Sequence, residues 1–81
     1  MLKEDTNYRT SDLYLAAYLK VSGVPFIEAQ RSADRVYFVF ENIEGLRDLK
    51  NGYYNRSLKV SALSFTDEIR TMKTLTHSLE R

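Results

Sequence analysis

Apolar side chains recur every three or four residues in three stretches of the chain, a spacing typical of amphipathic helices. The predicted helices lie near residues 11–22, 43–54 and 62–78. The first is apolar around almost its whole circumference, apart from Asp12 and Lys20, so it needs cover on two sides. The stripe of the third helix is a clear 3.6-residue repeat that runs from Phe65 to Leu79.

Capping residues indicate where these helices begin and end. The side chains of Thr10-Ser11-Asp12 can accept hydrogen bonds from the free N–H groups of a first turn. Gly23 and Pro25 then supply the signals that end the first helix. The expected caps of the second and third helices are Asn42 and either Ser61 or Ser64.

Two stretches near 26–31 and 35–40 are predicted to be strands. The second is rich in β-branched and aromatic residues, which strands favour. With a period of two, Val36, Phe38 and Phe40 share one face and Tyr37 and Val39 share the other. Ser32-Ala33-Asp34 suits a short hairpin loop, although it lacks a glycine. The pattern leaves open a third short extended segment at Leu58–Val60.

The resulting order is helix, strand, strand, helix, helix, which predicts one α+β domain over residues 10–79. In this fold a two-stranded antiparallel hairpin is covered by the helices. Residues 1–9 have little to bury except Tyr8, and we expect them to form a flexible N-terminal arm. The expected core consists of Leu15, Leu19, Val36, Phe38, Phe40, Leu46, Leu49, Phe65, Ile69 and Met72.

A set of core-patterned segments is spread over residues 8 to 76. The segments are Tyr8–Asp12, Leu15–Leu19, Val36–Phe40, Tyr53–Asn55 and a closing helix with Ile69, Arg70, Lys73 and Leu75. Together they resemble a family of short, uncharacterised bacterial and phage proteins classed as a domain of unknown function. The resemblance implies a bacterial or phage origin and a small stand-alone domain. It implies no activity, cofactor or catalytic residue.

Composition narrows the range of partners and compartments. The 81 residues carry a formal net charge of +1 and include no cysteine. A near-neutral chain predicts no strong attraction to nucleic acid, and the basic residues Lys3 and Arg9 have acidic neighbours, which argues against a DNA-contacting arm. The lack of cysteine favours a reducing compartment, so we expect a cytoplasmic protein. The apolar stretch Leu13–Leu19 is too short to span a membrane, and we expect no membrane partner.

Catalytic and metal-binding residues are scarce. His77 is the one histidine and lies near the C-terminal end, where we expect it to be solvated. Asp67 and Glu68 are adjacent, so on a helix their side chains point about 100° apart and do not converge easily. Gly45 and Gly52 fit no phosphate-binding fingerprint. We therefore expect no enzyme, no catalytic residues, no metal site and no cofactor.

Binding is the better-supported class of function. Our leading hypothesis is a small interaction module that acts through protein–protein contacts, as a homodimer. The nearly all-apolar first helix needs cover, and a two-stranded hairpin leaves free edges with which a second chain can pair. The six tyrosines are expected mostly to pack in the domain with their hydroxyl groups reaching water.

The alternative hypothesis is a nucleic-acid-binding domain. Tyr37 points away from the apolar strand face and is flanked in sequence by Arg31 and Arg35, a combination that single-strand binders use. On the third helix, Arg70 and Lys73 form a basic stripe that could contact phosphates. Both features also have an ordinary interpretation as solvated surface, so the sequence leaves the two classes of binding open.

Overall fold

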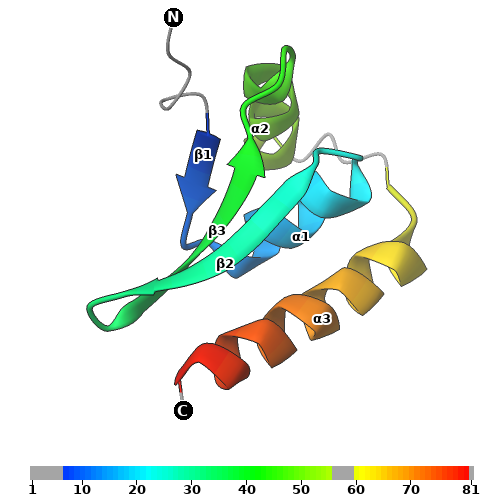
Figure 1. The fold of residues 1–81 in the computed structure, drawn as a ribbon. Helices are drawn as coiled ribbons and strands as arrows, with labels where there is room; N and C mark the ends of the chain where they lie inside the picture. Colours follow the sequence, from blue (N-terminus) through cyan, green and yellow to red (C-terminus); the bar gives the residue numbers. More distant parts are fainter. Residues whose placement is uncertain (1–6, 56–59, 81) are drawn as a thin grey trace, which may run out of the picture.

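The computed structural model describes residues 7–55 and 60–80, which form three strands and three helices (Figure 1). In chain order the elements are β1 (Asn7–Thr10), α1 (Leu13–Val21), β2 (Phe26–Ser32), β3 (Arg35–Glu41), α2 (Leu46–Tyr54) and α3 (Ala62–Glu80). The expected α+β class is confirmed, and the predicted helices and strands are present. The observed order has one strand more than expected, at its start. The segment expected at Leu58–Val60 lies mostly outside the described residues.

Strand β1 replaces part of the expected N-terminal arm. Residues 7–9 belong to β1, while residues 1–6 lie outside the described residues. The strand pairs antiparallel with β3, where Tyr8 lies opposite Phe40 and Thr10 opposite Phe38. Only one residue of this short strand is apolar, so the sequence pattern was too weak to predict it. The sheet is therefore three-stranded instead of two-stranded.

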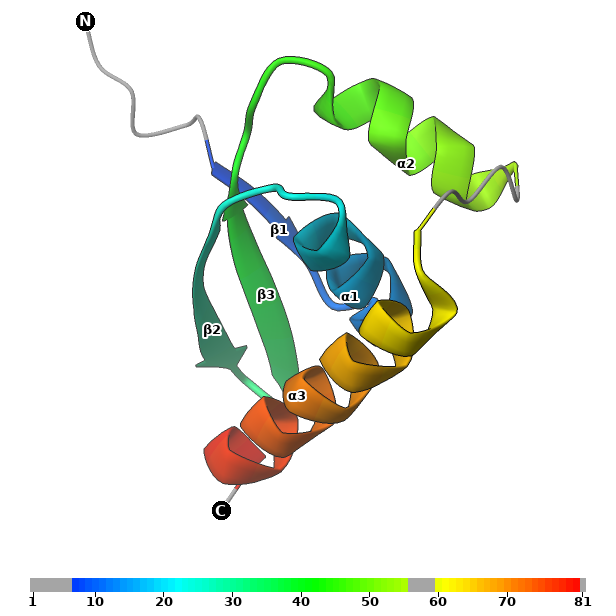
Figure 2. The ribbon, with the colours of Figure 1, turned by 90° about the vertical axis from the view of Figure 1, so that its right-hand side faces the viewer.

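The sheet has the order β1-β3-β2, which places β3 at its centre. Helices α1 and α3 lie together against one face of the sheet (Figure 2). In the described part of the chain no helix lies on the opposite face, which we call the open face. Because β3 has a neighbour on each side and helices on one face, its apolar residues are the most deeply buried of the sheet.

The β2–β3 hairpin closes with a shorter loop than expected. Ser32 pairs with Arg35, so only Ala33 and Asp34 connect the strands. Ala33 has a φ of 58°, in the left-handed region that favours glycine. At the other end of the hairpin, a bulge between Phe26 and Glu28 shifts the register of β2. The loop length decides which side chains of β2 share a face with those of β3.

Helix α1 is capped as expected. The Asp12 side chain accepts hydrogen bonds from the backbone N–H groups of Tyr14 and Leu15, at 3.1 and 3.2 Å. The chain turns after the helix at Gly23, which has a φ of 97°. Helix α1 therefore begins directly after β1 in the chain, and only two residues connect the two elements.

The beginnings of α2 and α3 differ in how well the sequence predicted them. Asn42 does not cap α2, because residues 43–45 form a turn and the helix begins after Gly45. Gly45 adopts a φ of 90° and has no side chain with which to cap the helix. For α3, the Ser61 hydroxyl oxygen accepts a hydrogen bond from the Ser64 N–H at 3.3 Å, so Ser61 is the cap.

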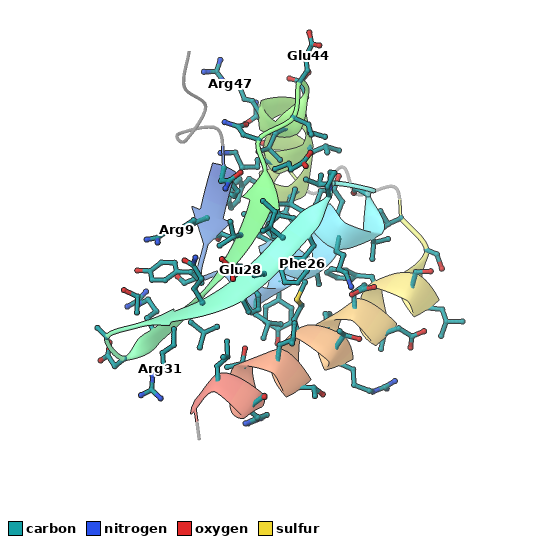
Figure 3. All side chains as sticks on the ribbon, viewed as in Figure 1. Arg9, Phe26, Glu28, Arg31, Glu44 and Arg47 are labelled. Atoms are coloured by element: carbon teal, nitrogen blue, oxygen red, sulfur yellow. The ribbon has the colours of Figure 1, made fainter. Side chains whose placement is uncertain are left out.

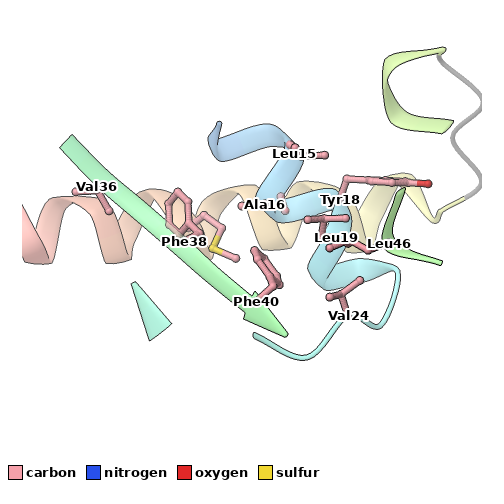
Figure 4. Packing of buried hydrophobic residues seen from close by; sticks show 11 residues of the cluster. Leu15, Ala16, Tyr18, Leu19, Val24, Val36, Phe38, Phe40 and Leu46 are labelled. Carbon is pink, nitrogen blue, oxygen red and sulfur yellow. The ribbon is translucent and has the colours of Figure 1, made fainter. Parts of the chain in front are cut away.

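The core lies between the sheet and the helices (Figure 4). Phe38 and Phe40 of β3 pack with Leu15 and Leu19 of α1 and with Met72 of α3. Most of the predicted core residues are buried, and the remaining ones, Leu49, Phe65 and Ile69, are partly buried against the core. The sheet, α2 and α3 together cover α1, whose central residues Leu15–Leu19 are all buried. The apolar circumference of α1 therefore needs no second chain.

Candidate functional site

Four tyrosines gather where β1, α1 and α2 meet, and we call them the tyrosine patch. Its members are Tyr8 of β1, Tyr14 of α1, and Tyr53 and Tyr54 of α2. The rings of Tyr53 and Tyr54 meet edge to face with centroids 5.2 Å apart, and Tyr18 lies 5.6 Å behind Tyr53. Tyr14 and Tyr54 remain 48% and 62% exposed. The patch is thus an aromatic surface supported from below by the core.

Burial, with a nearby carboxylate, raises the pKa of two tyrosines of the patch, Tyr53 and Tyr54. Burial raises the pKa of Tyr53 above its ordinary value of 10.0, and the carboxylate of Asp12 raises it further. Burial, Tyr8 and Asp12 raise the pKa of Tyr54 in the same direction. On the other side, the ammonium group of Lys50 lies 4.3 Å from the centre of the Tyr8 ring. Among the described residues, the acid Asp12 and the base Lys50 therefore border the patch, and the hydroxyl groups of Tyr53 and Tyr54 can donate hydrogen bonds at neutral pH.

A second group of polar side chains lies on the open face. The Arg9 guanidinium lies 4.6 Å from the centre of the Tyr37 ring and 3.4 Å from the side-chain oxygen of Gln30. Gln30 in turn donates a hydrogen bond to the Glu28 carboxylate at 2.8 Å. Val39, which lies between Arg9 and Glu28 in the sheet, is almost completely buried beneath them. These contacts link all three strands.

Two of the predicted nucleic-acid residues, Arg35 and Tyr37, lie together on this open face. Arg35 is two residues from Tyr37 on β3, and its guanidinium lies 3.4 Å from the Ser11 hydroxyl. We call the group the open-face cluster and define it as Arg9, Glu28, Gln30, Arg35 and Tyr37. Arg35 is exposed and Tyr37 is partly exposed.

The structure places Arg31 on the other side of the sheet. Arg31 lies opposite Val36, whose side chain faces the helices, and it donates a hydrogen bond to the Leu79 carbonyl of α3 at 3.2 Å. Figure 3 shows Arg31 near the end of α3, away from Arg9 and Glu28. The prediction that Arg31 lies beside Tyr37 is therefore wrong, whereas Arg35 does lie on the same face as Tyr37. A three-residue loop would have paired Arg31 with Arg35, whereas the observed two-residue loop moves Arg31 to the opposite face.

The predicted basic residues of α3 also lie away from the open face. Arg70 and Lys73 are exposed, and α3 packs on the helix-covered side of the sheet. Arg70 lies 3.4 Å from the Asp67 carboxylate, one turn earlier on the same helix. The five predicted residues therefore do not form one continuous surface.

Arg9, Glu28 and Gln30 are the members of the open-face cluster that sequence reasoning missed, and Arg9 is the cation among them. Its acidic neighbours in the sequence suggested a neutral arm. The alternation of side chains along β1 could have identified Arg9. Tyr8 and Thr10, on either side of Arg9, turn toward the core, so Arg9 turns away from the core. Once β1 is recognised as a strand, Arg9 must share the open face with Val39, its partner in the register.

A hollow of about 540 Å³ lies among α1, α2 and α3. Its described lining residues are Tyr18, Val21, Ser22, Leu49, Val60, Ser61 and Ser64. They combine apolar side chains with hydroxyl groups, and none of them carries a charge. Because none of these described residues is charged, they identify no class of ligand by themselves.

Catalytic and metal-binding groups are dispersed in the structure. His77 is exposed on the last turns of α3. Among residues 7–55 and 60–80, no three His, Asp or Glu side chains are close enough together to hold a metal ion. Within the same ranges, no helix is both long and apolar enough to cross a bilayer.

Comparison with known proteins gives a family but no activity. Residues 5–78 match the family described as Domain of unknown function (DUF5659). No curated protein and no solved structure matches the chain significantly. The match covers nearly the whole chain, from the segment before β1 to the end of α3.

Proposed function

The chain belongs to the DUF5659 family of domains of unknown function, and from its surface we propose that it is a small protein-interaction module. The proposed contact surface is the tyrosine patch, and the proposed partner is a second copy of the same chain. The single observation that carries the proposal is the exposure of Tyr14 and Tyr54, at 48% and 62%, within one aromatic group.

Aromatic side chains in this setting suit a protein contact. Tyrosine is enriched in the buried centres of protein interfaces, because its ring adds a large area and its hydroxyl still forms hydrogen bonds. The ring of Tyr54 is already held against Tyr53, so little side-chain entropy is lost when a partner covers it. The tyrosines would form the centre of an interface of roughly 800 Å² per partner.

A second copy fits the charges of the patch. Of the described residues, Asp12 and Lys50 border it with opposite charges, so that the Asp12 of one copy can face the Lys50 of the other. Two-fold pairing of one patch with itself is the commonest form of assembly. The role proposed is binding and not catalysis, and the lack of cysteine favours the reducing cytoplasm as its location.

Sedimentation velocity tests this proposal. We expect the unaltered chain to dimerise with increasing concentration and the double variant Tyr14→Ser/Tyr54→Ser to remain a monomer over the same range. Leu63→Ser is the matched control, because Leu63 is 71% exposed on α3 and lies outside the patch. An unaltered chain that stays monomeric at high micromolar concentration would refute the dimer. Equal loss of the dimer in Leu63→Ser would refute the patch.

A further inference from the structure

The open-face cluster combines a stacked guanidinium, an aromatic ring and a second cation on the sheet face that no described helix covers. We propose that this cluster binds single-stranded nucleic acid, with a base stacking on the Arg9–Tyr37 pair and Arg35 holding a neighbouring phosphate. The proposal concerns a different surface from the tyrosine patch and does not depend on the dimer. Of the residues that the sequence suggested it keeps Arg35 and Tyr37, and it replaces Arg31 with Arg9.

The stacking platform is held in place before any ligand arrives. Arg9 lies over the Tyr37 ring at 4.6 Å, and its contact with the Gln30 oxygen holds the guanidinium over the ring. Arginine planes and aromatic rings both stack with bases, and every base offers a face for stacking. Val39 beneath the cluster is 3% exposed, so the platform rests on packed side chains.

The distribution of charge favours an anionic strand near the hairpin. The Arg9 guanidinium lies over the Tyr37 ring and Arg35 lies at the hairpin end of β3, whereas Glu41 lies at the opposite end of β3, paired with Asn7. The nearer carboxylate, Glu28, already accepts a hydrogen bond from Gln30. A nucleic-acid strand that runs along β3 from Tyr37 to Arg35 therefore meets two cations before it reaches Asp34, the loop residue next to Arg35.

Only a few phosphates can be neutralised by this surface, which gives the proposal a quantitative signature. With two arginines in contact, the logarithm of affinity should fall with the logarithm of salt concentration with a slope no steeper than about −1.4. Binding that depends on stacking more than on charge should also prefer single strands to duplexes, whose bases are already stacked.

Fluorescence anisotropy with labelled oligonucleotides of about ten nucleotides, at low salt, tests the proposal. Single-stranded DNA, single-stranded RNA and duplex DNA are titrated in parallel, so that the kind of strand is identified. We expect Tyr37→Ala to weaken single-strand binding by about 5- to 150-fold, the range measured for one lost stack. Tyr37→Phe should bind as the unaltered chain does, and Arg9→Lys should lose the stacking part while retaining the charge.

Arg31→Gln is the matched control for Arg35→Gln. Both remove one exposed hairpin arginine, but Arg31 faces the end of α3 and Arg35 the open face. Weaker binding in Arg35→Gln with unchanged binding in Arg31→Gln would support the proposal. Absence of binding by the unaltered chain would overturn it, as would equal losses in the two variants or a duplex bound as tightly as a single strand. Thermal melts of each variant exclude unfolding as the cause.

Discussion

At the scale of single residues, the two phenylalanines of β3 contribute most to the enclosed core. Phe38 is 1% exposed and lies among α1, α3 and the sheet (Figure 4). Phe38→Ala should lower the free energy of unfolding by about 3–5 kcal/mol, because it removes buried area and leaves a cavity. A loss of that size approaches the whole stability of a small domain. A thermal melt or urea titration measures it, and an unchanged midpoint would show that this face is not the core.

The loop residue Ala33 presents the opposite case, in which a substitution should stabilise the chain. Its φ of 58° strains an L-residue but not glycine. Ala33→Gly should therefore raise the free energy of unfolding by about 0.5–1 kcal/mol, after the greater flexibility of glycine in the unfolded chain is subtracted. Asp34→Gly, at the neighbouring loop position without a positive φ, should not stabilise. Urea denaturation measures the free energy of unfolding of both variants. An Ala33→Gly variant that is less stable than the unaltered chain would contradict the strain at Ala33.

The raised pKa of Tyr53 predicts how stability changes with alkaline pH. A folded-state pKa above the unfolded value of 10.0 contributes stability that is present below pH 10.0 and is lost as the pH rises through the folded pKa. Tyr53→Phe, which cannot ionise at this position, should show a smaller loss of melting temperature above pH 10.0. Asp12→Asn should lower the pKa of Tyr53, measured by ultraviolet titration, because it removes one of the raising charges. No difference between these variants and the unaltered chain would contradict this environment of Tyr53.

At the scale of elements, the sequence predicted the three described helices and β3 from apolar residues in register with their own repeats, and β2 from Phe26 and Ile27 at its start. Strand β1 lacks such a repeat and is defined by its partner β3, which the local sequence does not reveal. The same limit affected the candidate site. The face of the sheet on which Arg31 lies depends on whether the loop has two or three residues. Because Ser32-Ala33-Asp34 contains no glycine, the sequence could not distinguish the two loop lengths.

The contact between α1 and α3 includes one ion pair across the core's edge. Lys20 Nζ lies 3.2 Å from the buried Glu68 Oε1, at ion-pair distance but without the alignment of a hydrogen bond. Because both side chains are partly exposed, a double-mutant cycle with Lys20→Met and Glu68→Gln should give a coupling of about 0.2–1 kcal/mol. Lys20→Met should be the more harmful single change, since it leaves a buried carboxylate oxygen without its cation. A coupling of zero in urea denaturation would remove this link between the helices.

At the scale of the whole molecule, the two proposed surfaces lie on different parts of the fold. The tyrosine patch belongs to the junction of β1, α1 and α2, whereas the open-face cluster lies on the sheet face that no described helix covers. The cover that α1 needs is supplied within one chain, so packing of α1 no longer argues for a dimer. The proposal of a dimer therefore depends on the exposed tyrosines.

The most direct test of that central claim is a dilution series of the unaltered chain, observed by NMR at the tyrosine ring resonances. We predict concentration-dependent shifts at Tyr8, Tyr14, Tyr53 and Tyr54, because these rings enter the interface as the dimer forms. Tyr37, on the open face, serves as the internal reference and should not shift. Resonances that are independent of concentration, or shifts at Tyr37 without shifts in the patch, would contradict the proposed interface.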